Sequence, residues 1–135
     1  MSLQGVILLG HGSRHPGLGR PFAGLQQWLQ AELGPGHRVE DAYLSLCAPT
    51  LEQAFETLHR EGLRQVSVLP LFLVAGHHVS EELPLLLDAA SRRFPDLQLS
   101  LSPHLGALGD IAPLLSKRLS QAVLRPACAA ASSAA

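Results

Sequence analysis

The chain has 135 residues, with 10 basic and 11 acidic side chains that leave it close to neutral. This length predicts one domain with a hydrophobic core, and the balanced charge argues against a nucleic-acid partner bound through bulk electrostatics. The N-terminal apolar run is too short to span a bilayer and lacks the basic region of a secretory signal, so no membrane partner is expected. Cys47 and Cys128 lie far apart, which argues against a thiolate metal site or a disulfide framework. We expect a soluble cytoplasmic protein.

The first half of the chain alternates predicted strands and helices. Leu3 to Leu9 is apolar and branched, as in a strand buried on both faces. A helix follows and ends at Gly34-Pro35-Gly36, and Arg38 to Leu44 predicts a second strand. The apolar positions of that helix, at helical spacing, are Phe22, Leu25, Trp28, Leu29 and Leu33. Pro49-Thr50 opens a second helix, closed by Gly62, whose apolar positions are Leu51, Ala54, Phe55 and Leu58.

The second half continues the alternation. Gln65 to Val74 predicts the third strand. Ser80 is the expected N-cap of a helix with Glu81 and Glu82 in its first turn, so that Pro84 falls near that turn. The last two expected elements are a strand from Leu97 to Leu101 and a helix from Ile111 to Leu124, stopped by Pro126.

Strands that alternate with helices predict an α/β fold with right-handed crossovers. We expect a four-stranded parallel sheet in the order 2-1-3-4, with helices on both faces, as in flavodoxin-like folds. Residues 1–125 are expected to form a single domain, and residues 126–135 to be a disordered tail with nothing to pack against.

Two stretches combine an apolar run, a glycine and imidazole. Val6 to Arg14 reads VILLGHGSR, and Pro70 to Pro84 reads PLFLVAGHHVSEELP. In the order 2-1-3-4 the topological switch point, where ligands bind outside the carboxyl ends of the strands, lies between the first and third strands. His11 and the pair His77-His78 are therefore expected at one cleft, where imidazole would bind a transition metal or accept protons near neutral pH.

The neighbouring residues allow two interpretations each. Gly12 either lets the backbone approach a ligand or forms a tight turn, and Arg14 either binds a carboxylate or makes a surface ion pair. Glu81 and Glu82 are explained by a helix start, with a role in the site as the alternative. The remaining histidines are weaker candidates: His15 and His104 follow strand ends and would line the cleft, His59 is expected to be structural, and His37 is expected to be solvated.

The two stretches, together with AYLSLCAPTLEQAFETLHREG between them, resemble the small CbiX/SirB sirohydrochlorin chelatases from about Gly5 to Leu124. The second stretch is the more specific, since the family pattern is roughly P-L-F-L-x-x-G-x-H-V-x-x-[DE]-[IL]-P. This pattern places the family histidine on His78 rather than His77, and the family acid on Glu82. One segment departs from the family: a pattern like E-L-A-E-P is usual where this chain has Ser45 to Pro49, so a carboxylate role there is in doubt.

The resemblance implies a flavodoxin/chelatase-like enzyme that inserts a divalent ion into sirohydrochlorin without ATP, in cobalamin or sirohaem synthesis. The ion would be a substrate, Co²⁺ first and Fe²⁺ or Ni²⁺ as alternatives. His11 and His78 would be the catalytic and metal-binding pair. Substrate contacts would come from Gly12, Ser13, Arg14, His77 and Glu82. Because longer relatives carry two such domains around one cleft, a single copy implies a homodimer.

Two other functions compete with this one. A non-catalytic carrier of metal or tetrapyrrole would need the same ligands as a chelatase. A phosphohistidine enzyme would need the order Arg-His-Gly, whereas here Arg14-His15 precedes Pro16 and His11-Gly12 follows Gly10, so the order is wrong.

Overall fold

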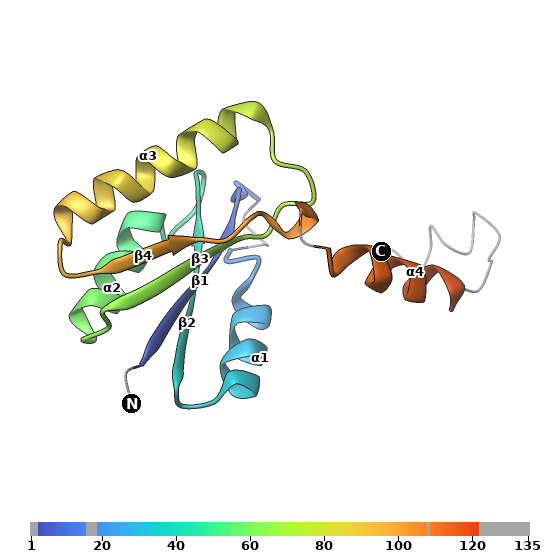
Figure 1. Ribbon diagram of the computed structural model, residues 1–135, viewed down its shortest axis with the longest axis horizontal. Helices are drawn as coiled ribbons and strands as arrows, with labels where there is room; N and C mark the ends of the chain where they lie inside the picture. The colour runs from blue at the N-terminus through green and yellow to red at the C-terminus, as the bar shows by residue number, and fades with distance from the viewer. Residues whose placement is uncertain (1–2, 16–18, 108, 122–135) are drawn as a thin grey trace.

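The computed structural model describes residues 3–15, 19–107 and 109–121, and it does not describe the side chain of His78. Four strands and four helices alternate along the chain, with a short 3₁₀ helix before the last helix (Figure 1). In order, the elements are β1 (Gln4–Gly10), α1 (Ala23–Leu33), β2 (His37–Tyr43), α2 (Leu51–Arg60), β3 (Gln65–Pro70), α3 (His77–Arg93), β4 (Gln98–Leu101), η1 (Leu105–Ala107) and α4 (Ile111–Ser120).

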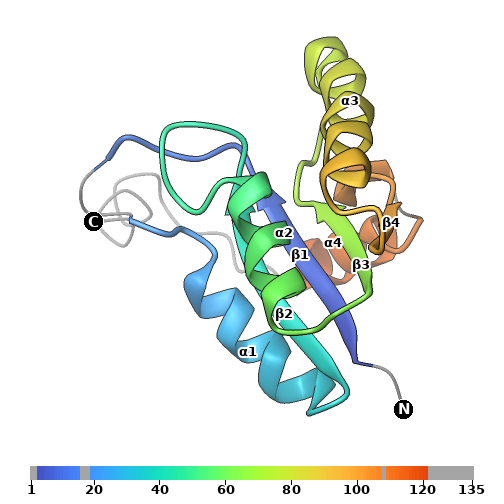
Figure 2. The same cartoon turned by 90° about the vertical axis from the view of Figure 1, so that its left-hand side faces the viewer.

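The strands form one sheet in the order β2-β1-β3-β4, and every neighbouring pair is parallel (Figure 2). The predicted fold class is therefore confirmed. β1 lies at the centre of this arrangement, with Leu9 opposite Ala42 on one side and Pro70 on the other. Because the strands are parallel and in step, the turns that follow them lie at the same edge of the sheet.

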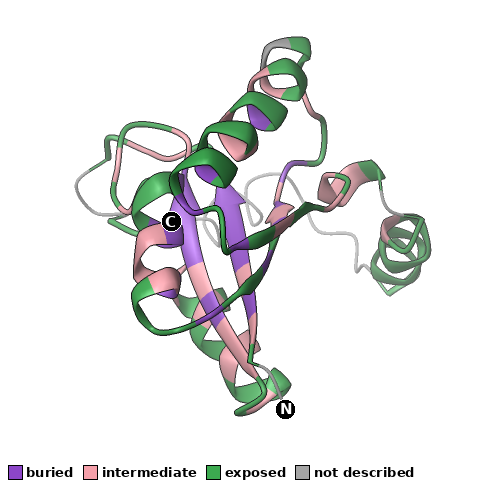
Figure 3. Ribbon diagram, turned by 60° about the vertical axis from the view of Figure 1, so that its left-hand side comes forward, coloured by how far each residue is buried: buried purple, intermediate pink, exposed green. Residues whose placement is uncertain are grey.

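Helices cover both faces of the sheet, but unequally. α2 and α3 pack on one face over the main hydrophobic core, which includes Ile7, Phe55, Val68 and Leu83 (Figure 3). α1 lies on the other face against β2 and has no buried residue of its own. The two-sided burial of β1, where Ile7 and Leu8 are both buried, follows from this sandwich of layers.

α2 has the clearest local start signal in the chain. Thr50 is the N-cap: its hydroxyl accepts a hydrogen bond from the Gln53 amide, and the Gln53 side chain accepts one from the Thr50 amide. This capping box satisfies two donors that the first turn would otherwise leave unpaired. The predicted apolar positions of α2 are all buried, so both its start and its inward face are confirmed.

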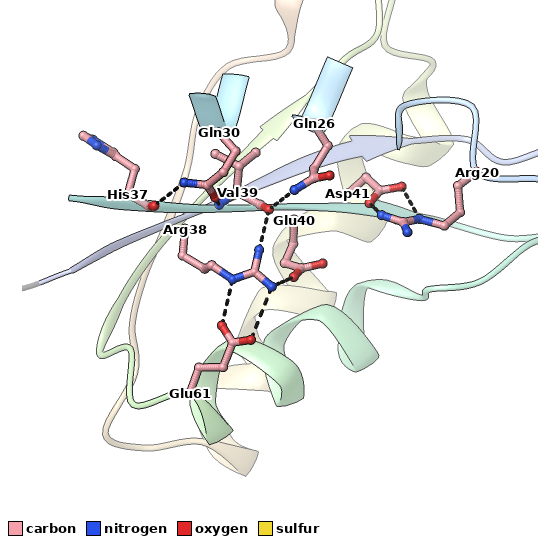
Figure 4. Close-up of polar contacts among 9 residues, drawn as sticks. All are labelled: Arg20, Gln26, Gln30, His37, Arg38, Val39, Glu40, Asp41 and Glu61. Atoms are coloured by element: carbon pink, nitrogen blue, oxygen red, sulfur yellow. Dashed lines mark hydrogen bonds and ion pairs between the residues drawn. The ribbon is translucent and has the colours of Figure 1, made fainter. Parts of the chain in front are cut away.

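Side chains from α1 and from β2 itself cap the outer edge of β2 (Figure 4). The Gln30 amide donates to the His37 carbonyl at 2.7 Å and accepts from the Val39 N–H at 2.8 Å, as a neighbouring strand would. The Val39 carbonyl accepts from the side chains of Gln26 and Arg38. Pairing these backbone groups makes this edge a poor template for the strand of another chain.

Two boundaries around the second histidine stretch differ from the sequence prediction. β3 ends at Pro70, not at Val74, because proline has no N–H for the ladder and the next residues leave the sheet. α3 begins at His77, with Gly76 as N-cap, and not after Ser80. The Ser80 amide donates the first helical hydrogen bond, to the Gly76 carbonyl, so Ser80 lies inside the first turn.

This earlier start changes what the acidic residues and the proline do. The first turn of α3 holds no acidic residue, so Glu81 and Glu82 do not serve as first-turn partners of the helix dipole. Pro84 lies in the helix interior, where its missing N–H leaves the Ser80 carbonyl without its usual partner.

The last helix, α4, spans Ile111–Ser120 and has Gln121 as its C-cap, so it ends before the predicted end at Leu124. It extends away from the body of the molecule beyond η1 (Figure 1). Leu124, Pro126 and the predicted tail of residues 126–135 lie outside the described residues. In the described ranges, no helix has the length and apolar character needed to cross a membrane.

The edge cap of β2 can be tested on stability. Replacing Gln30 by Ala leaves the N–H of Val39, a fully buried residue, without its partner. We expect the free energy of unfolding to fall by about 1–3 kcal/mol, measured by urea denaturation. The matched control is Gln27→Ala, at an exposed position of the same helix. Equal stabilities for the two variants would contradict the capping role.

Candidate functional site

The candidate site is the carboxyl edge of the sheet, where four turns converge. Residues 11–15 follow β1, residues 44–50 follow β2, residues 71–76 follow β3, and residues 102–107 follow β4. Backbone hydrogen bonds join these turns: Leu44 donates to Gly10 and Ser45 donates to His11, at 2.9 and 3.0 Å. The pairing of β1 with β2 therefore continues past the strands and fixes the backbone at His11.

His11 is solvent-exposed, and its ring is stacked on Phe72. The two ring centroids lie 4.1 Å apart with an interplanar angle of 25°. Phe72 itself is buried, 3% exposed, and belongs to the main core. An exposed imidazole thus rests on a fixed aromatic side chain, which restricts its orientation while its other face remains open to solvent.

Gly12 is required by a close backbone approach. Its φ of 104° lies in the left-handed region, and a Cβ added there would lie 1.8 Å from the Ser45 carbonyl oxygen. Of the two interpretations that the sequence left open, tight backbone packing therefore explains this glycine. A contact between Gly12 and substrate remains a prediction.

Ser13 and Arg14 differ in what they already contact. The Ser13 hydroxyl accepts a hydrogen bond from the His15 amide at 3.1 Å, which stabilises the turn. Arg14 is exposed, and within the described ranges its guanidinium forms no ion pair. It is therefore available for a ligand carboxylate, the role predicted for it.

His77 and His78 occupy the first turn of α3, beyond the carboxyl ends of β1 and β3 (Figures 1 and 2). The backbone here is helical, so positions 77 and 78 are separated by about 100° around the helix axis. His77 is 88% exposed and pairs with Glu81, at 3.0 Å between Nε2 and Oε1. Residues 78 and 82 are also one helical turn apart, so they share a face of α3. The side chain of His78 lies outside the described residues.

The weaker histidine candidates lie in different parts of the fold. His104 lines a pocket of about 180 Å³ together with Val79, Ser80 and Phe72, the residue on which the His11 ring stacks. His59, by contrast, lies at the far end of α2 and pairs with Asp96 at 2.9 Å, as expected of a structural histidine. His37 is the first residue of β2 and is half-buried, so the expectation of a solvated turn position is wrong.

A buried carboxylate behind the edge escaped the sequence analysis. Asp41 of β2 is fully buried and forms an ion pair with Arg20, whose Nε lies 3.0 Å from Oδ2 (Figure 4). Tyr43 donates to the same Asp41 oxygen at 2.7 Å and accepts from the Phe22 amide at 2.8 Å. We call Arg20, Asp41 and Tyr43 the Asp41 cluster. It ties the residues just before α1 to β2.

The pKa values in the Asp41 cluster follow from burial and charge. Burial favours the neutral carboxyl, but the hydrogen bonds from Arg20 and Tyr43 outweigh it, so the pKa of Asp41 is lowered. Burial, together with the bond to Asp41, raises the pKa of Tyr43 well above its ordinary value. Asp41 is therefore a structural anion that is already fully engaged, and it is a poor proton acceptor for a substrate.

Carboxylates are scarce where the family pattern would place them. Residues 45–49 read Ser-Leu-Cys-Ala-Pro and hold none. Within the described part of the chain, no group of three or more His, Cys, Asp or Glu side chains could hold a metal ion.

The sequence profile of CbiX matches residues 5–122. The chain belongs to the CbiX family. Among solved structures, it is similar to a putative cobalamin biosynthesis CbiX protein from Marinobacter aquaeolei VT8, with a TM-score of 0.70, 24% identity and coverage of 88% of this chain and 99% of that one. A second similar structure is the sirohydrochlorin chelatase SirB from Bacillus subtilis subspecies spizizenii in complex with cobalt, with a TM-score of 0.72, 25% identity and coverage of 87% and 50%.

Curated relatives of this CbiX-family chain carry two names. A sirohydrochlorin cobaltochelatase from Methanopyrus kandleri is 32% identical over 61% of this chain and 57% of its own length. A sirohydrochlorin ferrochelatase from Bacillus subtilis is 24% identical over 86% and 44%. The chain thus spans about half the length of these relatives. A sirohydrochlorin cobaltochelatase from Methanosarcina acetivorans, 25% identical over 88% of this chain, is covered over 96% of its length.

The Asp41 cluster predicts a pH-dependent stability. Asp41→Asn should lower the free energy of unfolding at neutral pH by about 2 kcal/mol, because the hydrogen bonds from Arg20 and Tyr43 lose their charged acceptor. The native pKa of Asp41 is depressed below its unfolded value of about 3.9, so this stabilisation is present above that pH and is lost as the pH falls through the native pKa.

Urea denaturation at neutral pH and at about pH 3 measures the gap between wild type and variant, which should narrow at the lower pH. The control is Asp88→Asn, an exposed carboxylate paired with Arg92 on the surface of α3, which should change stability little at either pH. If the difference in free energy of unfolding between wild type and Asp41→Asn is the same at both pH values, Asp41 is not the structural anion described above.

Proposed function

We propose that this protein is a sirohydrochlorin metal chelatase that inserts a divalent ion into the tetrapyrrole without ATP. The observation that carries the proposal is the placement of His11 after β1 and of the His77-His78 turn after β3, two adjacent parallel strands of a CbiX-family chain. The names of the curated relatives, which act on sirohydrochlorin, support the substrate.

The proposed chemistry requires two events at the same place. The metal ion must exchange water for ring nitrogens, and the macrocycle must lose two pyrrole N–H protons. A neutral imidazole has one basic lone pair, which can bind a divalent ion first and, once the ring nitrogens have taken the ion, can accept a pyrrole proton near neutral pH. His11 is exposed on one face and supported on the other by Phe72, so an incoming ion and ring reach it without rearrangement of the loop.

We assign His78 as the second metal-handling residue, with His77 secondary. Three considerations support this choice: the family pattern falls on His78, His77 already pairs with Glu81, and positions 78 and 82 share a helix face. Glu82, one helical turn further along α3, is proposed as a substrate contact.

The substrate carboxylates need positive partners at the same edge. Arg14 is exposed and without an ion pair among the described residues, and it is the proposed bidentate partner. Gly12, Ser13 and His77 are proposed to contact the ring or its side chains. Co²⁺ is the proposed ion, with Fe²⁺ and Ni²⁺ as alternatives, in cobalamin or sirohaem synthesis in the cytoplasm. Relatives named for cobalt and for iron both support a choice within this group.

One alternative function has a specific observation in its favour. Residues 45–49 lack the carboxylates of the family pattern, and a carrier of metal or tetrapyrrole needs no proton acceptor there. Absorbance of sirohydrochlorin with excess Co²⁺ separates the two functions, because a catalyst converts many equivalents of substrate and a carrier at most one.

The histidine assignments predict a graded loss of activity. His11→Ala and His78→Ala should each lower the rate of cobalt insertion about a hundredfold or more, because each removes a metal ligand and a proton acceptor. His77→Ala should cost far less. The rates are followed by the absorbance change, with circular dichroism to verify folding.

The outcome is decisive in two ways. Near-normal turnover by His78→Ala combined with an inactive His77→Ala would place the second residue at His77. Full activity of both His11→Ala and His78→Ala would exclude the proposed mechanism.

We also propose that the active form is a homodimer whose interface borders the cleft. α4 carries an apolar stripe at helical spacing that is open to solvent: Leu114, Leu115 and Leu119 are 60%, 50% and 72% exposed. α4 follows η1, which lies at the carboxyl edge, and we propose that a second copy packed on this stripe borders that edge. The capped edge of β2 disfavours association there.

The dimer can be tested by light scattering at micromolar protein concentration. Wild type should have twice the mass of one chain, and a Leu115→Glu/Leu119→Glu double variant should be monomeric with reduced activity. Ser116→Glu, an exposed polar position of the same helix, is the control and should remain dimeric. A fully active monomeric wild type would overturn this proposal.

A further inference from the structure

The contact between His11 and Phe72 depends on how the residues after β3 are held. On one side, the Leu71 amide donates to the Leu9 carbonyl at 2.8 Å, which ties this turn to β1. On the other side, the Gly106 amide donates to the Phe72 carbonyl at 2.9 Å. Phe72 is therefore fixed between β1, which leads to His11, and η1, which follows β4.

The contact with η1 is unusually close. A Cβ added to Gly106 would lie 1.7 Å from the Leu73 carbonyl oxygen and 2.5 Å from its carbon. These are backbone atoms, which a side-chain rotation cannot move away. Only glycine at position 106 lets η1 approach the backbone that carries Phe72.

We propose that Gly106 is a positioning residue for His11. By letting η1 hold the backbone of residues 72–73, it fixes the Phe72 ring against the imidazole and so keeps the exposed histidine in one orientation. The proposal rests on the proposed function in that His11 handles the metal ion. Gly106 lies outside both histidine stretches, and its amide joins the segment between β4 and α4 to the backbone of Phe72.

The physical reason is the cost of ordering an exposed side chain. A free surface histidine samples several rotamers, and a metal ion or proton must wait for the productive one. A stacked aromatic ring restricts these rotamers before the substrate arrives, and small displacements of a positioned group reduce rates strongly. Loss of this support should therefore lower the rate of the chemical step and leave substrate binding nearly unchanged.

The test compares Gly106→Ala with Gly109→Ala. Position 109 follows in the same segment, but an added Cβ there has no neighbour within 4 Å, so it is a matched control. The first readout is NMR of the His11 ring protons, which the face of Phe72 shifts upfield. Gly106→Ala should lose most of this shift and lower kcat for cobalt insertion about tenfold or more, with little change in KM for sirohydrochlorin. Gly109→Ala should change neither quantity.

Phe72 variants keep the proposal falsifiable if Gly106→Ala does not fold. Phe72→Leu keeps an apolar side chain but removes the aromatic face, so it should also lose the shift and lower kcat. Phe72→Tyr keeps the aromatic ring, so it should keep both the upfield shift of the His11 protons and the wild-type kcat. Unchanged His11 shifts in Gly106→Ala and Phe72→Leu, or a lost shift with normal kcat, would overturn the proposal.

Failure of the proposed function has a different signature. If wild type inserts no cobalt, the His11 shifts and the Kd for Co²⁺, measured by titration of the same resonances, still decide whether Gly106 orients this side chain. A lost shift and weaker Co²⁺ binding in Gly106→Ala, with Gly109→Ala as wild type, would support the positioning role even then.

Discussion

The parallel pairing of β1 with both of its neighbours is the constraint on which the rest of the structure depends. Seven residues of β1 pair in step with β2, and six pair with β3. Because all the strands run the same way, each must return through a crossover, and the turns that carry His11 and His77-His78 meet at one edge. The hydrophobic core beneath α2 and α3 holds the strands in place, so the ends of the strands fix the positions at which the irregular turns begin.

The turns at this edge are rigid because they pack on one another through backbone atoms. Gly12 lies against the Ser45 carbonyl, and Gly106 lies against the Leu73 carbonyl. Between these contacts, Phe72 extends the hydrophobic core up to the underside of His11. A site built this way would hold the exposed imidazole with little freedom, as the proposed transfer of a metal ion to a macrocycle requires.

The distribution of carboxylates shapes how this site would work. Asp41 is buried, ionised and already bound to Arg20 and Tyr43, so its charge stabilises the entry to α1 and is not available to a ligand. Residues 45–49 hold no acid, whereas Glu81 and Glu82 lie on α3, one turn beyond the histidines. Under the proposed function, proton transfer at this edge would depend on imidazole, and Arg14 would be the counter-charge for an anionic substrate.

The sequence by itself determined the strand order, the start of α2, its buried face, and the shared edge of the two histidine stretches. Apolar periodicity and turn residues are local signals that predict the elements. Parallel topology then places the residues that follow the strands at one edge of the sheet. Only the tertiary structure decided the rest. Leu73 and Val74 are apolar yet exposed, so a prediction from hydrophobicity alone placed the end of β3 four residues too late. The strand ends at Pro70, and the residues after it leave the sheet. An aspartate among the buried residues of β2 was a visible anomaly, but its partner Arg20 is 21 residues away, and no spacing rule connects them. Gly106 and Phe72 meet for the same reason: contacts between turns that follow different strands exist only once the sheet has brought those turns together.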